Sequence, residues 1–391
     1  MYEFEVPASI KQNLSAYYRA YFWFREDDAQ SIVHQGRKTI MVLFYICFVV
    51  SIGVGGQITA DKDQRIFVSL MSVLASVHNY RIWLVLWKKK SILKCVDKIG
   101  IYYTKDPKKF DQLNNLLKLF MKFGDFFTIV INVGIVSVSF IYPILSRLSG
   151  KRGLFFSNAF VFDYSASDVS YLAVNVFVNM AMFQTAVVCS TIVPIVWYLL
   201  LSLVFRYRIL RHQLKNLGKT FAMEDNSLSG NTQQKLFMKE LLMAMHDYDK
   251  INRLVDEFAS TFSVMFFLQT MTSAICLCGS IYNLAFSSHN NYPQDIGSCV
   301  ILSFILFDIF MIMYLGNEIM LGSNDLSYYL FQSNWLDLTP SNKKCILILK
   351  ERLKRPQELL VGKLYPLNLD TFTSIMKGTY SVFNILLKFR R

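Results

Sequence analysis

The sequence predicts an all-α integral membrane protein with seven transmembrane helices, and two observations carry this prediction. First, the chain of 391 residues has a positive mean hydropathy of +0.32 and only 18% charged residues, against about 25% in soluble globular domains. Second, runs of about 20 residues with almost no charge recur along it, the length that a helix needs to cross a membrane. An ordinary soluble enzyme, a disordered chain and a small disulfide scaffold are therefore excluded.

Seven segments are predicted to span the membrane, six of them strongly apolar and the last interrupted by polar residues. In order, they are residues 39–58, 66–87, 126–145, 171–205, 258–286, 296–315 and 369–387. The second span contains Arg81, which we expect to snorkel toward the lysines at 88–90. The sixth contains Asp308 and the seventh contains Lys377. A lone charge inside a membrane is costly, so these two are candidates for a functional role.

The placement of Lys and Arg predicts the orientation. The N-terminal segment and the loops after the second, fourth and sixth spans hold 31 of them, whereas the other loops and the C-terminal tail hold eight. Because basic residues are retained in the cytoplasm, the N-terminus should be cytoplasmic and the C-terminus extracellular. This is opposite to a G-protein-coupled receptor. The first 38 residues contain no apolar h-region, so we expect no cleaved signal peptide.

The chain divides into three expected parts. Residues 1–38 form a cytoplasmic N-terminal segment, and residues 39–338 hold six transmembrane helices with helical extensions into the cytosol. Residues 339–391 hold a cytosolic anchor helix and the seventh span. In the anchor helix, Ile346, Leu349 and Leu353 form an apolar stripe, which is typical either of a helix on the inner leaflet or of one that packs subunits together.

No pattern in the sequence indicates catalysis. The five histidines fall in five different segments, and the C-x-C pair of Cys276 and Cys278 has no second pair beside it. Gly53, Gly55 and Gly56 lie inside an apolar run, where close helix packing explains them. We therefore expect no enzyme, no metal, no cofactor and no nucleic-acid partner.

An ordered set of residues marks the C-terminal third. The set is Gly316-Asn317-Glu318, Tyr329, Trp335, Lys343-Lys344, Arg355-Pro356, Gly362, Pro366-Leu367, Leu369, Thr371-Phe372, Ile375-Met376-Lys377 and Tyr380-Ser381. In this order it resembles the C-terminal part of the insect odorant receptor family, and the length, seven spans and inverted orientation extend the resemblance to the whole chain. The related gustatory receptors place Gln-Phe after a Thr-Tyr pair; here Thr379-Tyr380 is followed by Lys388-Phe389 instead.

The resemblance implies a function and partners. Members of the family are ligand-gated, non-selective cation channels of the plasma membrane of sensory neurons, with four subunits whose last helices line a central pore. The family's co-receptor has a much longer fourth loop, so this chain looks like a tuning subunit that assembles with co-receptor subunits in a heterotetramer. The other expected partners are a small apolar volatile and membrane lipid. A gustatory receptor-type channel and a membrane transporter remain alternatives.

The resemblance also places candidate sites. It brings the outer halves of the second, third, fourth and sixth spans together around the odorant. The residues offered there are Leu70, Val73, Leu74, Val77, Ile135, Val138, Tyr142, Val178, Met182, Phe183, Ala186, Gly297, Val300 and Phe304. This lining is apolar and suits a volatile with at most one hydrogen-bonding group.

Matching the last helix to the family places the gate of the pore at Phe383, with Tyr380 and Leu386 beside it. Apolar residues there are consistent with closure by dewetting. Lys388, Arg390 and Arg391 at the outer mouth would repel cations, which favours a heteromer. Asp308 and Lys377 have similar depths on consecutive helices, so we expect them to form an ion pair, or to share waters, and to couple the sixth helix to the seventh. The alternative is that each charge reaches cytoplasmic water separately.

Overall fold

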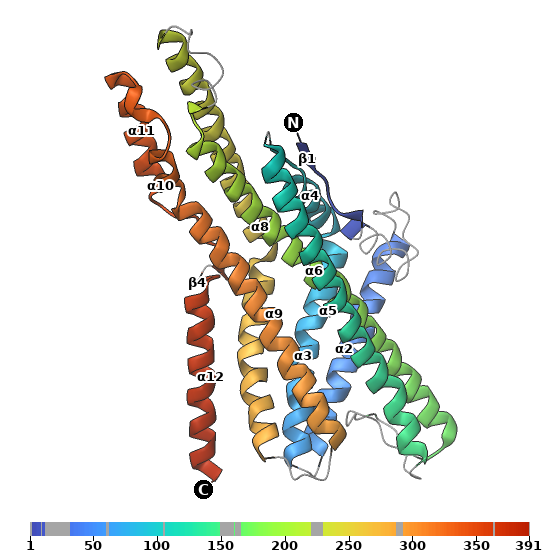
Figure 1. The fold of residues 1–391 in the computed structure, drawn as a ribbon. Helices are drawn as coiled ribbons and strands as arrows, with labels where there is room; N and C mark the ends of the chain where they lie inside the picture. Colours follow the sequence, from blue (N-terminus) through green and yellow to red (C-terminus); the bar gives the residue numbers. More distant parts are fainter. Residues whose placement is uncertain are drawn as a thin grey trace.

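Long helices lie side by side in a bundle, with the N-terminus near one end and the C-terminus at the other (Figure 1). The computed structural model describes residues 2–8, 10–11, 32–59, 62–104, 106–148, 160, 166–219, 230–286, 292–362 and 364–390. Most of the predicted N-terminal segment lies outside the described residues.

The described part of the chain contains eleven helical segments and two small two-stranded sheets. The long helices are α2 (Ile32–Ile58), α3 (Lys62–Trp87), α5 (Pro107–Leu148), α6 (Asp168–Lys215), α8 (Gly230–Phe286), α9 (Tyr292–Asn324) and α12 (Leu369–Arg390). The short ones are α4 (Lys89–Gly100), α10 (Leu326–Phe331), the 3-10 turn η1 (Trp335–Asp337) and α11 (Pro340–Leu353). Strand β1 (Tyr2–Phe4) pairs antiparallel with β2 (Tyr102–Thr104), and β3 (Leu360–Val361) with β4 (Tyr365–Pro366).

The predicted all-α membrane architecture is confirmed, because each of the seven predicted spans falls inside one long helix. In the part of the chain that the structure describes, four stretches are long and apolar enough to cross a membrane by length and composition. They are Gln35–Ile58, Asp168–Lys215, Thr232–Tyr282 and Ser298–Phe331. The second, third and seventh predicted spans lie in α3, α5 and α12.

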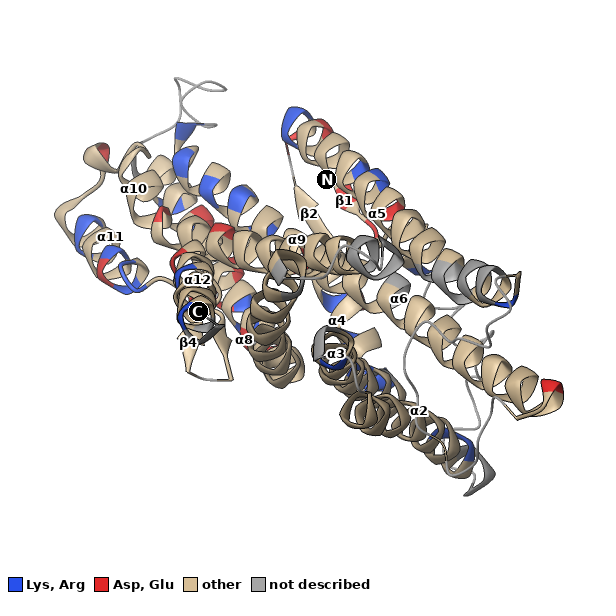
Figure 2. Ribbon diagram, turned by 90° about the horizontal axis from the view of Figure 1, so that it is seen from below, with Lys and Arg blue, Asp and Glu red and all other residues tan. Residues whose placement is uncertain are grey.

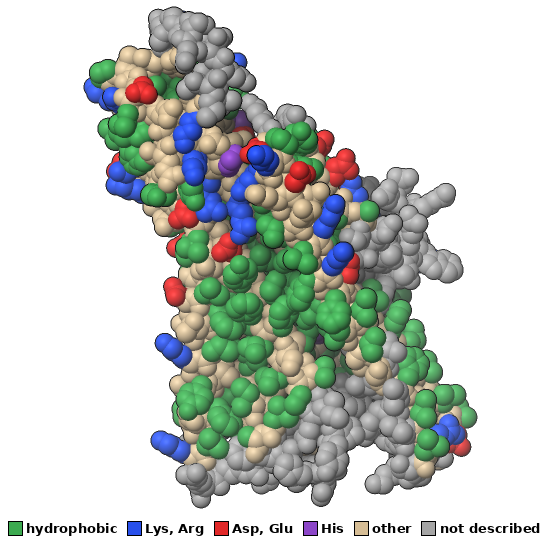
Figure 3. Space-filling model, viewed as in Figure 1, with side chains coloured by type: hydrophobic (Ala, Val, Ile, Leu, Met, Phe, Trp, Pro, Cys, Tyr) green, Lys and Arg blue, Asp and Glu red, His purple; other side chains and the backbone are tan. Residues whose placement is uncertain are grey.

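The surface of the molecule is divided into an apolar belt and a charged end. Figure 3 shows a broad hydrophobic belt over the middle and lower parts of the bundle, whereas most Lys, Arg, Asp and Glu side chains gather at the end near α10 and α11. Helices α6, α8 and α9 run from the belt into this charged end, which is the predicted cytosolic side (Figure 1). All three helices are longer than one membrane crossing needs.

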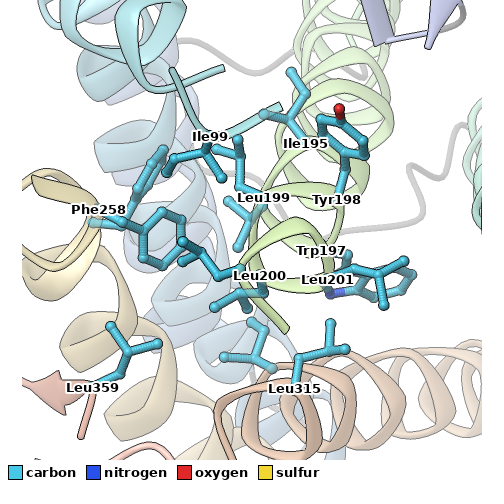
Figure 4. Packing of buried hydrophobic residues seen from close by; sticks show 14 of the residues in the cluster. Ile99, Ile195, Trp197, Tyr198, Leu199, Leu200, Leu201, Phe258, Leu315 and Leu359 are labelled. Atoms are coloured by element: carbon cyan, nitrogen blue, oxygen red, sulfur yellow. The ribbon is translucent and has the colours of Figure 1, made fainter. Parts of the chain in front are cut away.

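Helix α6 forms the centre of the bundle. Nearly every side chain from Ile192 to Phe205 is buried, on all faces of the helix. A helix that is apolar all round belongs inside a larger protein. Figure 4 shows residues 195–201 of α6 surrounded by side chains of α4, α8, α9 and the segment before β3. This core positions the helices that carry the candidate site.

One buried arginine joins α4 to α6. The Arg206 guanidinium donates to the backbone carbonyl oxygens of Lys98, Ile99 and Ile101, at distances of 2.6–3.1 Å. The last carbonyl groups of a helix lack partners inside the helix, so these hydrogen bonds cap the end of α4. They also explain how a charge is accommodated next to an apolar core.

The β3–β4 hairpin connects the cytosolic helices to α12. Gly362 in its turn has φ +55°, a conformation that favours glycine, and its Cα lies against the ring of Phe267.

The predicted apolar stripe of α11 is buried within the chain itself rather than left free for lipid. It consists of Ile346, Leu349 and Leu353. An ion pair between Arg352 and Asp249 at 2.7 Å fixes α11 beside α8.

Candidate ligand site and pore helix

A buried ion pair lies where α3, α8 and α9 meet. Arg81 of α3 approaches the Asp308 carboxylate of α9 at 3.4 Å, and both side chains are only 4% exposed. Gln269 of α8 donates from Nε2 to the same Asp308 oxygen at 2.6 Å. One acidic group thus connects three helices.

The predicted pairing of Asp308 with Lys377 is therefore wrong. Lys377 is exposed on α12, whereas Asp308 is enclosed on the other side of α9. The expected snorkelling of Arg81 is also wrong, because this side chain is buried against Asp308. Two charges inside an apolar bundle stabilise each other at close range, and separate burial of either one would be costly.

A small cavity borders this ion pair. It has a volume of about 10 Å³, which is about the space of one water molecule. Its polar wall is formed by Arg81, Asp308 and Gln269, together with His78, Thr272 and Ser273. Its apolar wall is formed by Leu74, Val77, Ile305 and Phe304. The cavity therefore combines buried hydrogen-bonding groups with a hydrocarbon surface.

Three of the predicted ligand-binding residues meet at this cavity: Leu74, Val77 and Phe304. Of the others, Leu70, Val178 and Ala186 are buried, and Val73 and Met182 are half-buried. Phe183 and Val300 are more than half exposed, so the structure does not bring them to the cavity. The side chains of Ile135, Val138 and Tyr142, and Gly297, lie outside the described residues.

No sequence pattern indicates a role for Gln269, because a single glutamine in an apolar span has many structural explanations. His78 was likewise unassigned; its ring lies within 3.7–3.9 Å of the Cys189 sulfur. Arg81 is recognisable in the sequence as a full charge inside a span, but snorkelling is the simpler interpretation of such a charge.

A larger cavity, of about 1520 Å³, lies at the cytosolic end beside β2, α6 and α8, and none of the predicted ligand residues lines it.

Helix α12 lies at the edge of the bundle and contacts α8 and α9 (Figures 1 and 2). The Phe372 ring meets the Phe310 ring of α9 at 5.5 Å between centroids. Met376 packs against a separate apolar cluster of Cys276, Leu277 and Ile305. Tyr380 is 66% exposed and Phe383 is half-buried, while the side chain of Leu386 lies outside the described residues.

The cluster behind Met376 connects the cavity to α12. Leu74 and Phe304, which line the cavity, also pack against this cluster. A change at the cavity therefore has a short path of side-chain contacts to the last helix.

Comparison with known proteins agrees with this architecture. A family model described as 7tm Odorant receptor matches residues 64–380. Odorant receptor 23a of Drosophila melanogaster is 27% identical over 58% of this chain and 57% of its own length. Odorant receptor 2a of the same fly is 24% identical over 61% of this chain and 60% of its own length. The matched region thus spans somewhat more than half the length of these curated relatives.

Among solved structures, the insect olfactory receptor OR5 from Machilis hrabei has the same fold. It is 14% identical, with a TM-score of 0.80 over 97% of both chains. The structure of that receptor in complex with eugenol matches with a TM-score of 0.75 over 98% of both chains.

The fold and the apolar helices define a multi-pass helical membrane protein. The family match covers most of the sequence, and the chain accordingly belongs to the 7tm odorant receptor family.

Proposed function

We propose that this chain is the odorant-binding subunit of a ligand-gated, non-selective cation channel. A small volatile binds in the outer half of the helix bundle, around Leu74, Val77 and Phe304, and opens a pore lined by α12. The observation that carries the proposal is the contact of Met376 with the same apolar cluster that supports Leu74 and Phe304. Occupation of the pocket would move this cluster and, through it, the pore helix.

The proposal includes assembly with co-receptor subunits into a heterotetramer. Exposed apolar side chains support an assembly surface at the cytosolic end, where no lipid tails would cover them. On α11, Ile348 is 72% exposed and Leu347 about half exposed, on the face opposite the buried stripe. Lys388 and Arg390 at the end of α12 favour a mixed assembly, because four copies would place eight positive charges around a cation pore.

The pocket is tested by filling it. Val77→Trp adds a large ring to a buried position that lines the cavity, so odorant-evoked current should fall by at least about tenfold while surface expression persists. The measurement is two-electrode voltage clamp of oocytes that express the chain with and without co-receptor, over a broad panel of volatiles. The control is Ser303→Ala, an exposed position on α9. Unchanged dose–response curves for Val77→Trp would contradict the pocket assignment.

The gate is tested at Phe383. If this ring closes the pore by excluding water, Phe383→Ser should raise the basal current severalfold, because a hydroxyl stabilises water in the constriction. Odorant selectivity should change little, since the pocket lies elsewhere. Thr373→Ala, an exposed position nearer the start of α12, serves as the control. Wild-type basal current and wild-type permeability ratios in Phe383→Ser would argue against a gate at this position.

A further inference from the structure

We propose that the cavity beside Arg81 and Gln269 recognises the hydroxyl group of a volatile alcohol or phenol. This inference rests on the proposed function, since it names the chemical class of the ligand for the same site. It depends on which polar atoms the fold leaves without partners, and on the size and shape of the space between them.

Three polar atoms at the cavity have no hydrogen-bond partner in the described part of the chain. One is Nε of Arg81, a donor, and the other two are Oε1 of Gln269 and Oδ1 of Asp308, both acceptors. All three residues are at least nine-tenths buried and all three line the cavity. A buried polar group without a partner is unfavourable, so such a group of atoms indicates a ligand or a water between them.

A hydroxyl group satisfies the donor and one acceptor at once. Its oxygen can accept from Arg81 while its proton is donated to Gln269 or to Asp308. A carbonyl oxygen can only accept, and a hydrocarbon does neither. An ammonium group would be repelled by the guanidinium. The Asp308 carboxylate offers a second acceptor beside the amide, because Arg81 and Gln269 both face its Oδ2 while its Oδ1 has no partner among the described residues.

The dimensions of the site agree with this assignment. A cavity of about 10 Å³ accommodates a single oxygen-sized group, not a whole odorant. The carbon skeleton would lie against the apolar wall, where Leu74 and Phe304 pack on the cluster of Cys276, Leu277 and Ile305. The polar end of the ligand is thus fixed at the ion pair and its apolar body at the cluster that contacts Met376 of α12.

The first test compares three chemical series at matched carbon number. Primary alcohols, methyl ketones and alkanes of four to ten carbons are applied to oocytes that express the wild-type chain with co-receptor. For the best chain length, we expect the alcohol to activate at a concentration about 10- to 100-fold lower than the alkane and about 3- to 10-fold lower than the ketone. An alkane as potent as the alcohol, or responses confined to compounds without a hydroxyl, would overturn the proposal.

Two variants then separate the donor from the acceptor. Gln269→Met removes one of the two acceptors, so the advantage of the alcohol over the ketone should shrink while both remain better than the alkane. The double variant R81M/D308L removes the donor together with its counter-charge, and all three series should become nearly equal in potency. Gln269→Met also keeps the test decisive if the double variant fails to reach the surface. Wild-type ranking in Gln269→Met would overturn the role of the amide oxygen.

The controls distinguish failure of this inference from failure of the proposed function. Ser303→Ala, exposed on α9, should preserve the wild-type ranking. If Val77→Trp abolishes all responses but the ranking survives in both polar variants, the pocket is correct and the hydroxyl assignment is wrong. If Val77→Trp leaves every response intact, the pocket itself is misplaced.

Discussion

Replacing Arg81 by methionine should strongly destabilise the receptor, and replacing Asp308 by leucine in the same chain should restore most of the loss. Either single substitution leaves one buried charge without its partner, at a cost of about 3–5 kcal/mol in the free energy of unfolding. The double variant replaces the pair by apolar side chains in an apolar bundle. Such a replacement is often neutral or stabilising.

The measurement is a double-mutant cycle on surface expression and on the melting temperature of detergent-solubilised protein. Each single variant should reduce surface expression severalfold, and the double variant should recover at least half of the wild-type amount. The control cycle uses Lys98 and Glu257, an ion pair at 2.7 Å whose side chains are 40% and 45% exposed. Because solvent screens exposed pairs, this control should show coupling below about 1 kcal/mol. Additive losses in the Arg81–Asp308 cycle would refute the pairing.

The partner of Asp308 shows where the sequence is insufficient. The depth of a residue in the membrane can be counted from the ends of its span, and by that count Asp308 and Lys377 lie at similar depths. Contact also requires that the two side chains face each other around their helix axes. Phe310 contacts Phe372 of α12 and lies about 200° around α9 from Asp308, at about 100° per residue. Asp308 thus points away from α12, toward α3 and α8.

The predicted ligand pocket has the same limit: the sequence predicts the depth of a residue but not the direction in which its side chain points. The outer halves of the spans could be predicted, because uncharged runs of about 20 residues and the distribution of Lys and Arg fix depth and direction. Which residues of a half-helix point inward depends on neighbouring helices that are distant in sequence. Phe304 lines the cavity whereas Val300, one turn away, is more than half exposed. Gln269 is recognisable only when Asp308 is seen beside it.

Gly316 belonged to the sequence set that carried the family resemblance, and the structure gives its physical reason. The glycine allows α9 to approach the segment that leads into α12, since a Cβ at this position would collide with the backbone carbonyl oxygen of Leu367. Leu367 cannot easily retreat. It is buried, and its N–H donates to the Leu359 carbonyl at 2.7 Å. Asn368 next to it caps α12 by accepting from the Thr371 N–H at 2.9 Å.

Gly316→Ala should therefore displace the start of α12 from α9 and uncouple the pore helix from the ligand pocket. Overpacking of this kind costs about 1–3 kcal/mol, and we expect odorant-evoked current per surface receptor to fall by about tenfold or more. Current is measured by voltage clamp and normalised to surface biotinylation. Gly134→Ala on α5 is the matched control, because an added Cβ there meets no atom of the described residues within 4 Å beyond its own helix backbone. In a helix interior this control should be neutral or slightly stabilising, since alanine has the higher helix propensity. Equal currents in the two variants would show that the close approach at Gly316 has no part in gating.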